Sequence, residues 1–159
     1  MLLGIIADTH IPTAAPCIPA DVLAAFEGVD LILHAGDLVS PSVIEELASV
    51  APVEAVAGNM DSPEVRRLLP AEKIVRAGGH RIGLVHGAGP VASIAERVRG
   101  TFDDVSAIVF GHSHTPLVRE VGGVLLMNPG SPTDRYFAAA RTVGRLHVGS
   151  QVRGEILYL

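Results

Sequence analysis

Short apolar runs alternate with amphipathic stretches through the first half of the chain, and this alternation is the feature that most restricts the fold. The runs expected as strands cover residues 2–7, 31–33 and 53–57, and the stretches expected as helices cover 20–26 and 41–50. Strands that alternate with helices form parallel sheets with right-handed crossovers. The first half therefore predicts an α/β arrangement built on a parallel sheet.

The second half has a different pattern, in which Gly-Gly pairs join apolar-rich runs. Residues 73–85 and 117–128 each contain two such runs around a Gly-Gly pair, which is the turn chemistry of two-residue β-hairpins. A third hairpin is expected in 141–159, a helix over 91–99 and a strand over 105–110. The whole pattern predicts an α/β fold of two packed mixed sheets covered by helices.

Composition and charge restrict the class of protein. Hydrophobic residues make up 48% of the chain and charged residues 18%, which is typical of a compact globular protein, and we expect a single domain over residues 1–159. The net charge of −5 provides no basic surface for a phosphate backbone and argues against stable nucleic-acid binding. The hydrophobic composition favours a homodimer.

The chain has no stretch with the length and apolar character of a membrane span, so no membrane association is expected. The apolar N-terminal run lacks a basic segment and reaches Asp8 after seven residues, which indicates a strand and not a signal peptide. Cys17 is the only cysteine and is expected to be inert; a lone cysteine fits a reducing compartment. We expect a cytoplasmic protein.

Polar side chains with metal-binding chemistry lie just beyond the ends of the expected strands. The carboxyl ends of strands in an α/β sheet share one edge, so these side chains should meet in space. The set is Asp8, His10, Asp37, Asn59, His86, His112 and His114. Imidazole, carboxylate and amide ligands suit first-row divalent ions, and the set is larger than one ion needs. A carboxylate can bridge two ions about 3.5–4 Å apart, and Asp37 is the candidate bridge.

Most of these residues fall in short motifs that occur in a fixed order. The motifs are DTH (8–10), HAGD (34–37), GNMD (58–61), VHG (85–87) and GHSH (111–114), followed by NPGSP (128–132). In content and order they resemble the calcineurin-like metallophosphoesterases. The short chain is similar to the compact bacterial and archaeal phosphodiesterase branch of that family.

This resemblance implies a four-layer αββα sandwich and a pair of divalent metal ions. The implied ligands are Asp8, His10, Asp37 and His114 for the first ion, and Asp37, Asn59, His86 and His112 for the second. Mn²⁺ is the first expectation, and Fe²⁺, Co²⁺, Ni²⁺ or Zn²⁺ also suit these ligands. The expected activity is a dinuclear metal-dependent phosphodiesterase or phosphatase, with a metal-bridging hydroxide attacking a small phosphoester, most simply a phosphodiester. Cyclic nucleotides, glycerophosphodiesters and monoesters are the open substrate alternatives.

Met60 is a departure from the family pattern. Many members have a histidine directly after the asparagine ligand, and the methionine here cannot donate a proton to a leaving group. The compact branch commonly lacks this histidine, so its absence does not indicate an inactive protein. Since phenolates need less protonation than alkoxides, we expect activated aryl diesters to be better substrates than alkyl phosphates.

Several other polar residues are expected to have structural roles. His34 is expected behind the metal ligands as a hydrogen-bonded residue, and Asp61 or Ser62 is expected to cap a short helix. Asn128 and Ser131 either shape the pocket, as the resemblance implies, or form a turn. The remaining residues considered are expected on the surface or in structural positions: His80, His147 and Arg135.

A different class of function is a non-catalytic protein-binding scaffold on the same fold. A eukaryotic retromer subunit similar to the compact branch serves chiefly in protein assembly, but it departs from the usual ligand set. Here every ligand type is present, and such a polar cluster is costly to maintain unless metal satisfies it. Turnover, and not metal content, would distinguish the two functions.

Overall fold

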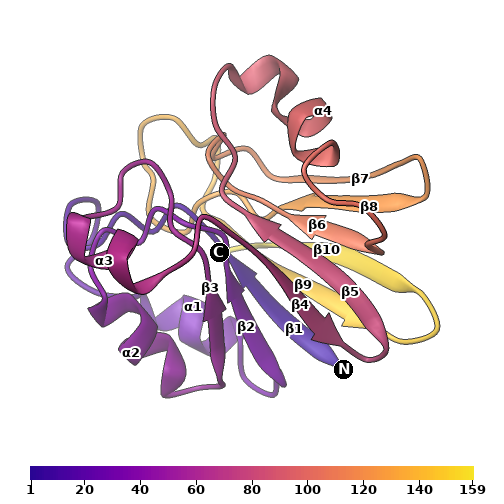
Figure 1. Cartoon of the computed structure of the whole chain (residues 1–159). Helices are drawn as coiled ribbons and strands as arrows, with labels where there is room; N and C mark the ends of the chain where they lie inside the picture. Colours follow the sequence, from indigo (N-terminus) through magenta and orange to yellow (C-terminus); the bar gives the residue numbers. More distant parts are fainter.

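The computed structural model describes residues 1–159 and contains two five-stranded sheets (Figure 1). The first sheet contains β1 (Leu2–Ile6), β2 (Leu31–His34), β3 (Val53–Ala55), β9 (Thr142–Val148) and β10 (Val152–Tyr158). The second contains β4 (Glu72–Ala77), β5 (His80–Val85), β6 (Ala107–Val109), β7 (Leu117–Val121) and β8 (Val124–Asn128). The helices are α1 (Ala20–Ala25), α2 (Ser42–Ala48), α3 (Pro63–Leu68) and α4 (Ile94–Arg99).

The first sheet has the strand order β10-β9-β1-β2-β3. Its strands β1, β2 and β3 are parallel, as the alternating pattern predicts, and β9 pairs antiparallel with β1. Helices α1, α2 and α3 contribute Val22, Leu47 and Val65 to a buried cluster with Ile6 and Ile32 of this sheet. These three helices therefore cover its outer face.

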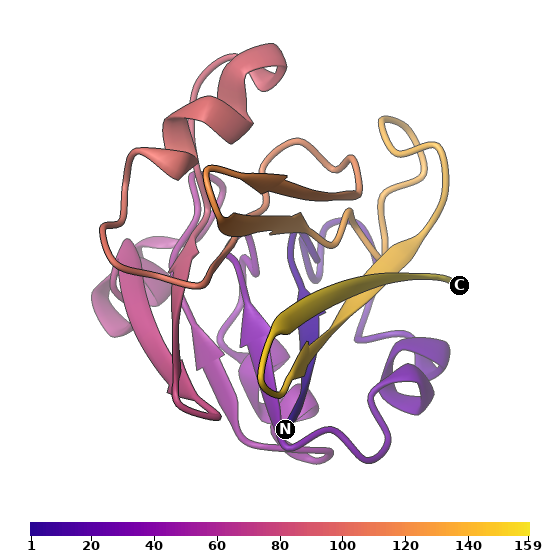
Figure 2. The ribbon, with the colours of Figure 1, turned by 90° about the vertical axis from the view of Figure 1, so that its right-hand side faces the viewer.

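The second sheet has the order β4-β5-β6-β8-β7. Both Gly-Gly hairpins form, with β4 antiparallel to β5 and β7 antiparallel to β8, while β5, β6 and β8 are parallel. Ile94 and Val98 of α4 pack against Ile108 and Leu126 of this sheet. Figure 2 shows α1 and α4 on opposite outer sides of the two sheets.

The inner faces of the sheets share one apolar core. Leu3 and Leu33 of the first sheet lie in one fully buried cluster with Ile82, Val109 and Met127 of the second. The αββα sandwich of two mixed sheets expected from the sequence is thus confirmed. The helix expected over 91–99 differs in detail, because its first turn, Val91–Ser93, is a 3₁₀ helix. None of the helices has the length and hydropathy needed to cross a membrane.

The packing between the sheets predicts a large effect of truncating Leu33, which is fully buried. Leu33→Ala should lower the free energy of unfolding by about 2–5 kcal/mol, because it leaves a cavity between two sheets that cannot close around it. Leu68→Ala is the matched control, since Leu68 is 64% exposed, and should cost no more than about 0.5 kcal/mol. Urea unfolding measures both, and equal effects would contradict this description of the core.

Candidate metal centre

The carboxyl ends of five strands meet at one edge of the sandwich, and the predicted residues lie there. Asp8 and His10 follow β1, Asp37 follows β2, Asn59 follows β3, His86 follows β5, and His112 and His114 follow β6. Each of these side chains lies within 4 Å of at least one other. The structure therefore brings together all seven residues that the sequence analysis selected.

One half of the cluster contains His10, His114 and Asp8. The Nε2 atoms of the two imidazoles are 3.2 Å apart. The Oδ1 atom of Asp8 lies 3.5 Å from Nε2 of His114 and 3.9 Å from Nε2 of His10. Donor atoms of these three residues are close enough together to hold a metal ion.

The other half is centred on the Asn59 side chain. Its Oδ1 atom lies 3.0 Å from Nε2 of His86 and 2.9 Å from Nδ1 of His112. Asp8, Asp37 and His86 form a second group of donor atoms with metal-binding spacing. The amide oxygen and two imidazole nitrogens thus converge on a point beside the first half.

Two carboxylates lie between the halves. The Oδ2 atom of Asp37 is 3.3 Å from Nε2 of His86 and 3.8 Å from Nε2 of His10. Asp8 also contacts both halves, because its Oδ1 atom is 3.9 Å from Nε2 of His86, and both metal-binding groups include it. From the sequence, Asp37 alone is predicted as the bridge, whereas the geometry gives Asp8 a similar position.

Three imidazoles are oriented by hydrogen bonds on their outer sides. Each of them donates an outer N–H to a carbonyl or carboxylate oxygen, so in the neutral imidazole the lone pair is on the nitrogen that faces the cluster. The pairs are His86 Nδ1 with Ala35 O at 2.8 Å, His112 Nε2 with Gly89 O at 3.0 Å, and His114 Nδ1 with Asp134 Oδ2 at 2.5 Å. Such outer hydrogen bonds are typical of metal-ligating histidines. The donor set therefore fits divalent metal.

The electrostatics of the cluster favour positive charge. Burial disfavours the protonated form of His114, but contacts with the carboxylates of Asp8 and Asp134 outweigh it and raise its pKa to about 9. Burial likewise opposes protonation of His86, but its hydrogen bond with Asp37 dominates and its pKa is raised. Burial acts to raise the pKa of Asp37, but His86 and the Met60 N–H hold it below the ordinary value. A cation between these groups is electrostatically favourable.

The backbone is strained where it presents these side chains. Five of the residues have positive φ angles, which L-residues other than glycine adopt rarely. They are Asp8 (55°), His10 (46°), Asp37 (57°), His112 (70°) and His114 (53°). Gly58 permits a close approach of the backbone, because a Cβ atom there would lie 2.2 Å from Oδ1 of Asp37. Clustered backbone strain of this kind is characteristic of functional sites.

Asp61 fixes the turns that carry two members of the cluster. Its carboxylate is buried and accepts hydrogen bonds from the backbone N–H groups of Asp37, Val39 and Gly58. The helix α3 is instead capped by Ser62, whose Oγ accepts from Val65 N. Of the two capping residues expected from the sequence, Ser62 is the one that caps.

His34 lies behind the cluster, fully buried. Its Nδ1 atom accepts from Gly36 N at 3.2 Å, and Nε2 lies 3.1 Å from Oγ1 of Thr9. Burial, with the neighbouring charge of His86, lowers the pKa of His34 to about 3. A neutral His34 therefore supports the turns after β1 and β2.

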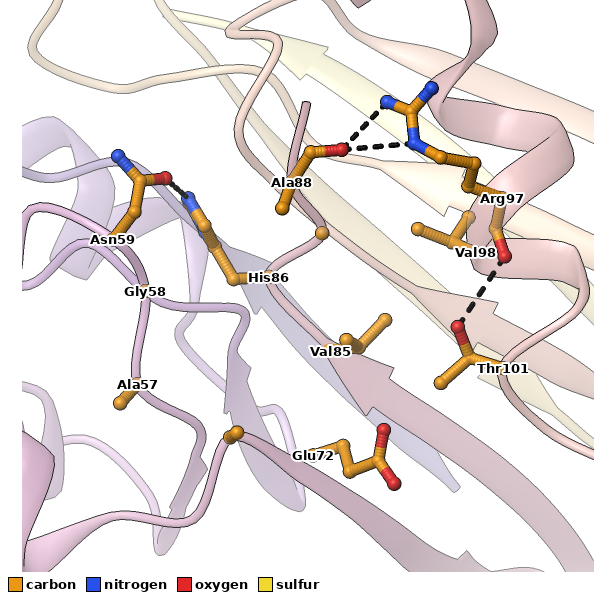
Figure 3. Close-up of a pocket in the computed structure, with 12 residues that line it drawn as sticks. Ala57, Gly58, Asn59, Glu72, Val85, His86, Ala88, Arg97, Val98 and Thr101 are labelled. Atoms are coloured by element: carbon orange, nitrogen blue, oxygen red, sulfur yellow. Dashed lines mark hydrogen bonds between the residues drawn. The ribbon is translucent and has the colours of Figure 1, made fainter. Parts of the chain in front are cut away.

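A cavity of about 450 Å³ opens beside Asn59 and His86 (Figure 3). Small residues such as Ala57 and Gly87 form much of its wall, and α4 closes one side. The guanidinium of Arg97 donates to Ala88 O at the rim, as Figure 3 shows. The volume is in the range of small-molecule pockets.

Comparison with known proteins identifies the family of the chain. A model of the calcineurin-like phosphoesterase superfamily domain matches residues 1–151. The chain belongs to this superfamily. A probable metallophosphoesterase from Methanothermobacter thermautotrophicus is 43% identical over 135 residues, which cover 84% of this chain and 78% of the relative. The resemblance inferred from the motifs is thus confirmed.

Solved structures share the fold over nearly the whole chain. Vacuolar protein sorting 29 from Cryptosporidium parvum has a TM-score of 0.83 and 26% identity, and the match covers 99% of this chain and 91% of that protein. A protein described as a novel archaeal phosphodiesterase has a TM-score of 0.74 and 24% identity, with coverage of 99% and 100%. The match to the archaeal phosphodiesterase, at 24% identity, supports the fold only.

The NPGSP segment of this calcineurin-like phosphoesterase is hydrogen-bonded to two turns of the cluster. Asn128 Nδ2 donates to Gly111 O at 2.7 Å, and Ser131 Oγ donates to Asp8 O at 2.7 Å. The sequence left two roles open for Asn128 and Ser131, forming a turn or shaping the site. Both roles apply, because these turn residues bond to the turns that carry the cluster. Asp134 was not selected from the sequence, and its only local signal is a carboxylate shortly after a motif.

The remaining candidates lie outside the cluster. His80 bonds with Ser106 and Gly149, and His147 faces Glu155. The other two candidates of the sequence analysis, Arg135 and Cys17, are both exposed.

Asp61 offers a stability test that separates its role from helix capping. Asp61→Ala should lower the free energy of unfolding by about 3 kcal/mol, because several largely buried N–H groups lose their acceptor. Ser62→Ala removes one capping bond and should cost about 1 kcal/mol. Urea unfolding of both variants measures the difference, and an equal or larger effect of Ser62→Ala would contradict the role given to Asp61.

His114 offers a pH test in metal-stripped protein. Its pKa is raised from 6.5 to about 9, so its contribution to stability is complete below pH 6.5 and is lost as the pH rises through 9. Asp134→Asn should move the midpoint of the His114 titration downward, as followed by NMR of the ring protons. His147 in β9 is the internal reference, because it bonds with Glu155 and lies outside the cluster. A midpoint that Asp134→Asn leaves in place would contradict the pairing.

Proposed function

We propose that this chain is a single-domain, dinuclear metal-dependent phosphodiesterase. The observation that supports it best is the orientation of the imidazoles of His86, His112 and His114, whose outer N–H groups are engaged while their inner nitrogens converge on carboxylate and amide oxygens. Imidazoles held on their outer sides in this way are typical of metal ligands. Membership of a phosphoesterase superfamily supports the same chemistry.

The residues divide between the two proposed metal positions. Asp8, His10 and His114 would hold one ion, and Asn59, His86 and His112 the other, with Asp37 shared and Asp8 near both. When bound, two divalent ions, most simply Mn²⁺, activate water at neutral pH and polarise phosphoryl oxygens. Asp37 uses its second oxygen, Oδ1, to accept the Met60 N–H at 2.7 Å, which leaves Oδ2 for the shared position.

The side chain of Met60 sets a limit on the leaving group. It is 59% exposed beside Asn59 and carries no proton to donate. A poor leaving group such as an alkoxide gains most from protonation, so the proposed enzyme should favour activated aryl esters. The cavity beside Asn59 and His86 has room for one ester group of a small diester.

A protein-binding scaffold is the second candidate. The likeness to vacuolar protein sorting 29 favours it, because the fold match covers nearly the whole of both chains. The oriented imidazoles and strained turns favour the enzyme, since a scaffold has no need of inward lone pairs. Turnover separates the two candidates.

The first test compares two nitrophenyl substrates with metal-stripped protein. Bis(p-nitrophenyl) phosphate should be hydrolysed only after Mn²⁺ is added, and faster than p-nitrophenyl phosphate. Release of p-nitrophenolate measures both reactions. Folded protein that turns over neither substrate with any first-row divalent ion would favour the scaffold, and preference for the monoester would contradict the diesterase.

The second test removes the shared carboxylate. Asp37→Ala should bind neither metal ion and should show only background hydrolysis, because each proposed position loses a ligand. Asp103→Ala is the matched control, since Asp103 is exposed on the loop before β6. Metal content by mass spectrometry and diester turnover are the measurements. Retention of both ions and of activity in Asp37→Ala would overturn the assignment.

A further inference from the structure

An aromatic side chain stands exposed beside the metal centre. Phe137 is 86% exposed, although the other three phenylalanines, Phe26, Phe102 and Phe110, are buried. A ring left in water forgoes the stabilisation that burial would give. Packing within this chain therefore does not explain why an aromatic side chain stands at position 137.

The ring lies next to a proposed metal ligand. The ring centroids of Phe137 and His114 are 6.5 Å apart, with an angle of 78° between the ring planes. This is an edge-to-face arrangement, which aromatic pairs prefer over a flat sandwich. One imidazole of the cluster and the exposed ring are thus neighbours at the mouth of the site.

The backbone that carries Phe137 is tied to the same site. The Asp134 carboxylate accepts from the N–H groups of Tyr136 at 2.8 Å, Phe137 at 3.1 Å and Ala138 at 3.1 Å. It also accepts from Nδ1 of His114. One carboxylate therefore positions both the imidazole and the turn that presents the ring, which reduces the entropic cost of binding a ligand against it.

The two flanks of the site differ in chemistry. The cavity near Asn59 and His86 has no Phe, Tyr or Trp in its wall, whereas Phe137 stands on the His114 side. Figure 2 shows α4, which borders the cavity, and the segment between β8 and β9 on opposite sides of the molecule. A phosphodiester carries two ester groups, and this site offers a different surface to each.

We propose that Phe137 determines specificity by stacking on a planar ring, either a nucleobase or an aryl ring, in the ester group of the substrate that is not cleaved. This proposal rests on the phosphodiesterase function proposed above. Aromatic side chains stack on planar rings with little regard to their hydrogen-bonding groups. The substrate class is therefore a phosphodiester whose retained ester group carries an aromatic ring, and a diester whose retained group is alkyl gains nothing from this contact.

The test uses three diesters with the same p-nitrophenolate leaving group and Mn²⁺-loaded protein. The second ester group is thymidine through its 5′ oxygen, phenyl or methyl. Phe137→Ala should lower kcat/KM for the aromatic esters relative to the methyl ester by about tenfold, which lies within the range for one base stacked on an aromatic ring. The loss should appear in KM, because the contact is made equally in the bound substrate and the transition state.

Two variants serve as controls, and a binding measurement gives a second readout. Tyr136→Ala removes a similarly exposed ring from the same turn, but that ring forms no aromatic pair with the site histidines. The ratio of kcat/KM for the aromatic esters to kcat/KM for the methyl ester should therefore be unchanged in this variant. Phe137→Trp should restore the preference. In Zn²⁺-loaded protein, thymidine 5′-monophosphate should shift the Phe137 ring protons in NMR spectra, whereas methyl phosphate should not.

The outcomes distinguish this inference from the function on which it rests. A preference for the thymidine ester alone that Phe137→Ala removes identifies a nucleobase, and a preference for both aromatic esters that it removes identifies any planar ring; either result supports the stacking role. Turnover of all three esters with a ratio that Phe137→Ala leaves unchanged overturns the role of Phe137 and leaves the diesterase intact. Failure of the wild-type protein to hydrolyse any ester overturns both.

Discussion

The rest of the structure has to stabilise two carboxylates that are buried away from water. Asp8 is fully buried and Asp37 nearly so, and an ionised carboxylate in such a place costs several kcal/mol unless it is paired and hydrogen-bonded. The partners come from distant parts of the chain: His86 and His114 contact these carboxylates, and the N–H groups of Met60 and His112 donate to them. Only the assembled pair of sheets brings those groups to one edge, so the site depends on the whole fold.

Strain and packing are linked through the same turns. Each non-glycine residue held at positive φ costs about 1–3 kcal/mol unless its surroundings fix it, and Asp8, His10 and Asp37 all adopt such angles. Two of these turns are fixed by buried side chains, because Ser131 Oγ donates to Asp8 O and the Asp61 carboxylate accepts from the Asp37 N–H. The apolar core between the sheets supplies the stability that offsets this strain.

The fold was predictable from the sequence because its signals are local. Alternating apolar runs and Gly-Gly turns report which face of a strand is buried and where the chain reverses, and the seven clustered residues were selected because each follows such a run. The roles of Asp61 and Asp134 were not predictable in this way. Asp134 contacts His114 across a loop and a hairpin, and no periodicity in the sequence reports a hydrogen bond between two turns. The same reason left Asn128 and Ser131 undecided.

Substitutions in the interior of the site and at its rim have different consequences. Inside, each oriented imidazole has a fixed outer partner, so replacing one group disturbs its neighbours, and effects of neighbouring substitutions do not add. At the rim, Met60 and Phe137 are largely exposed, and exposed positions change with little effect on stability, typically within about 0.5 kcal/mol. A chain with this architecture can therefore alter which ester it accepts through rim residues while the interior chemistry stays the same. The ligand motifs belong to the interior, so they identify the superfamily and not the substrate.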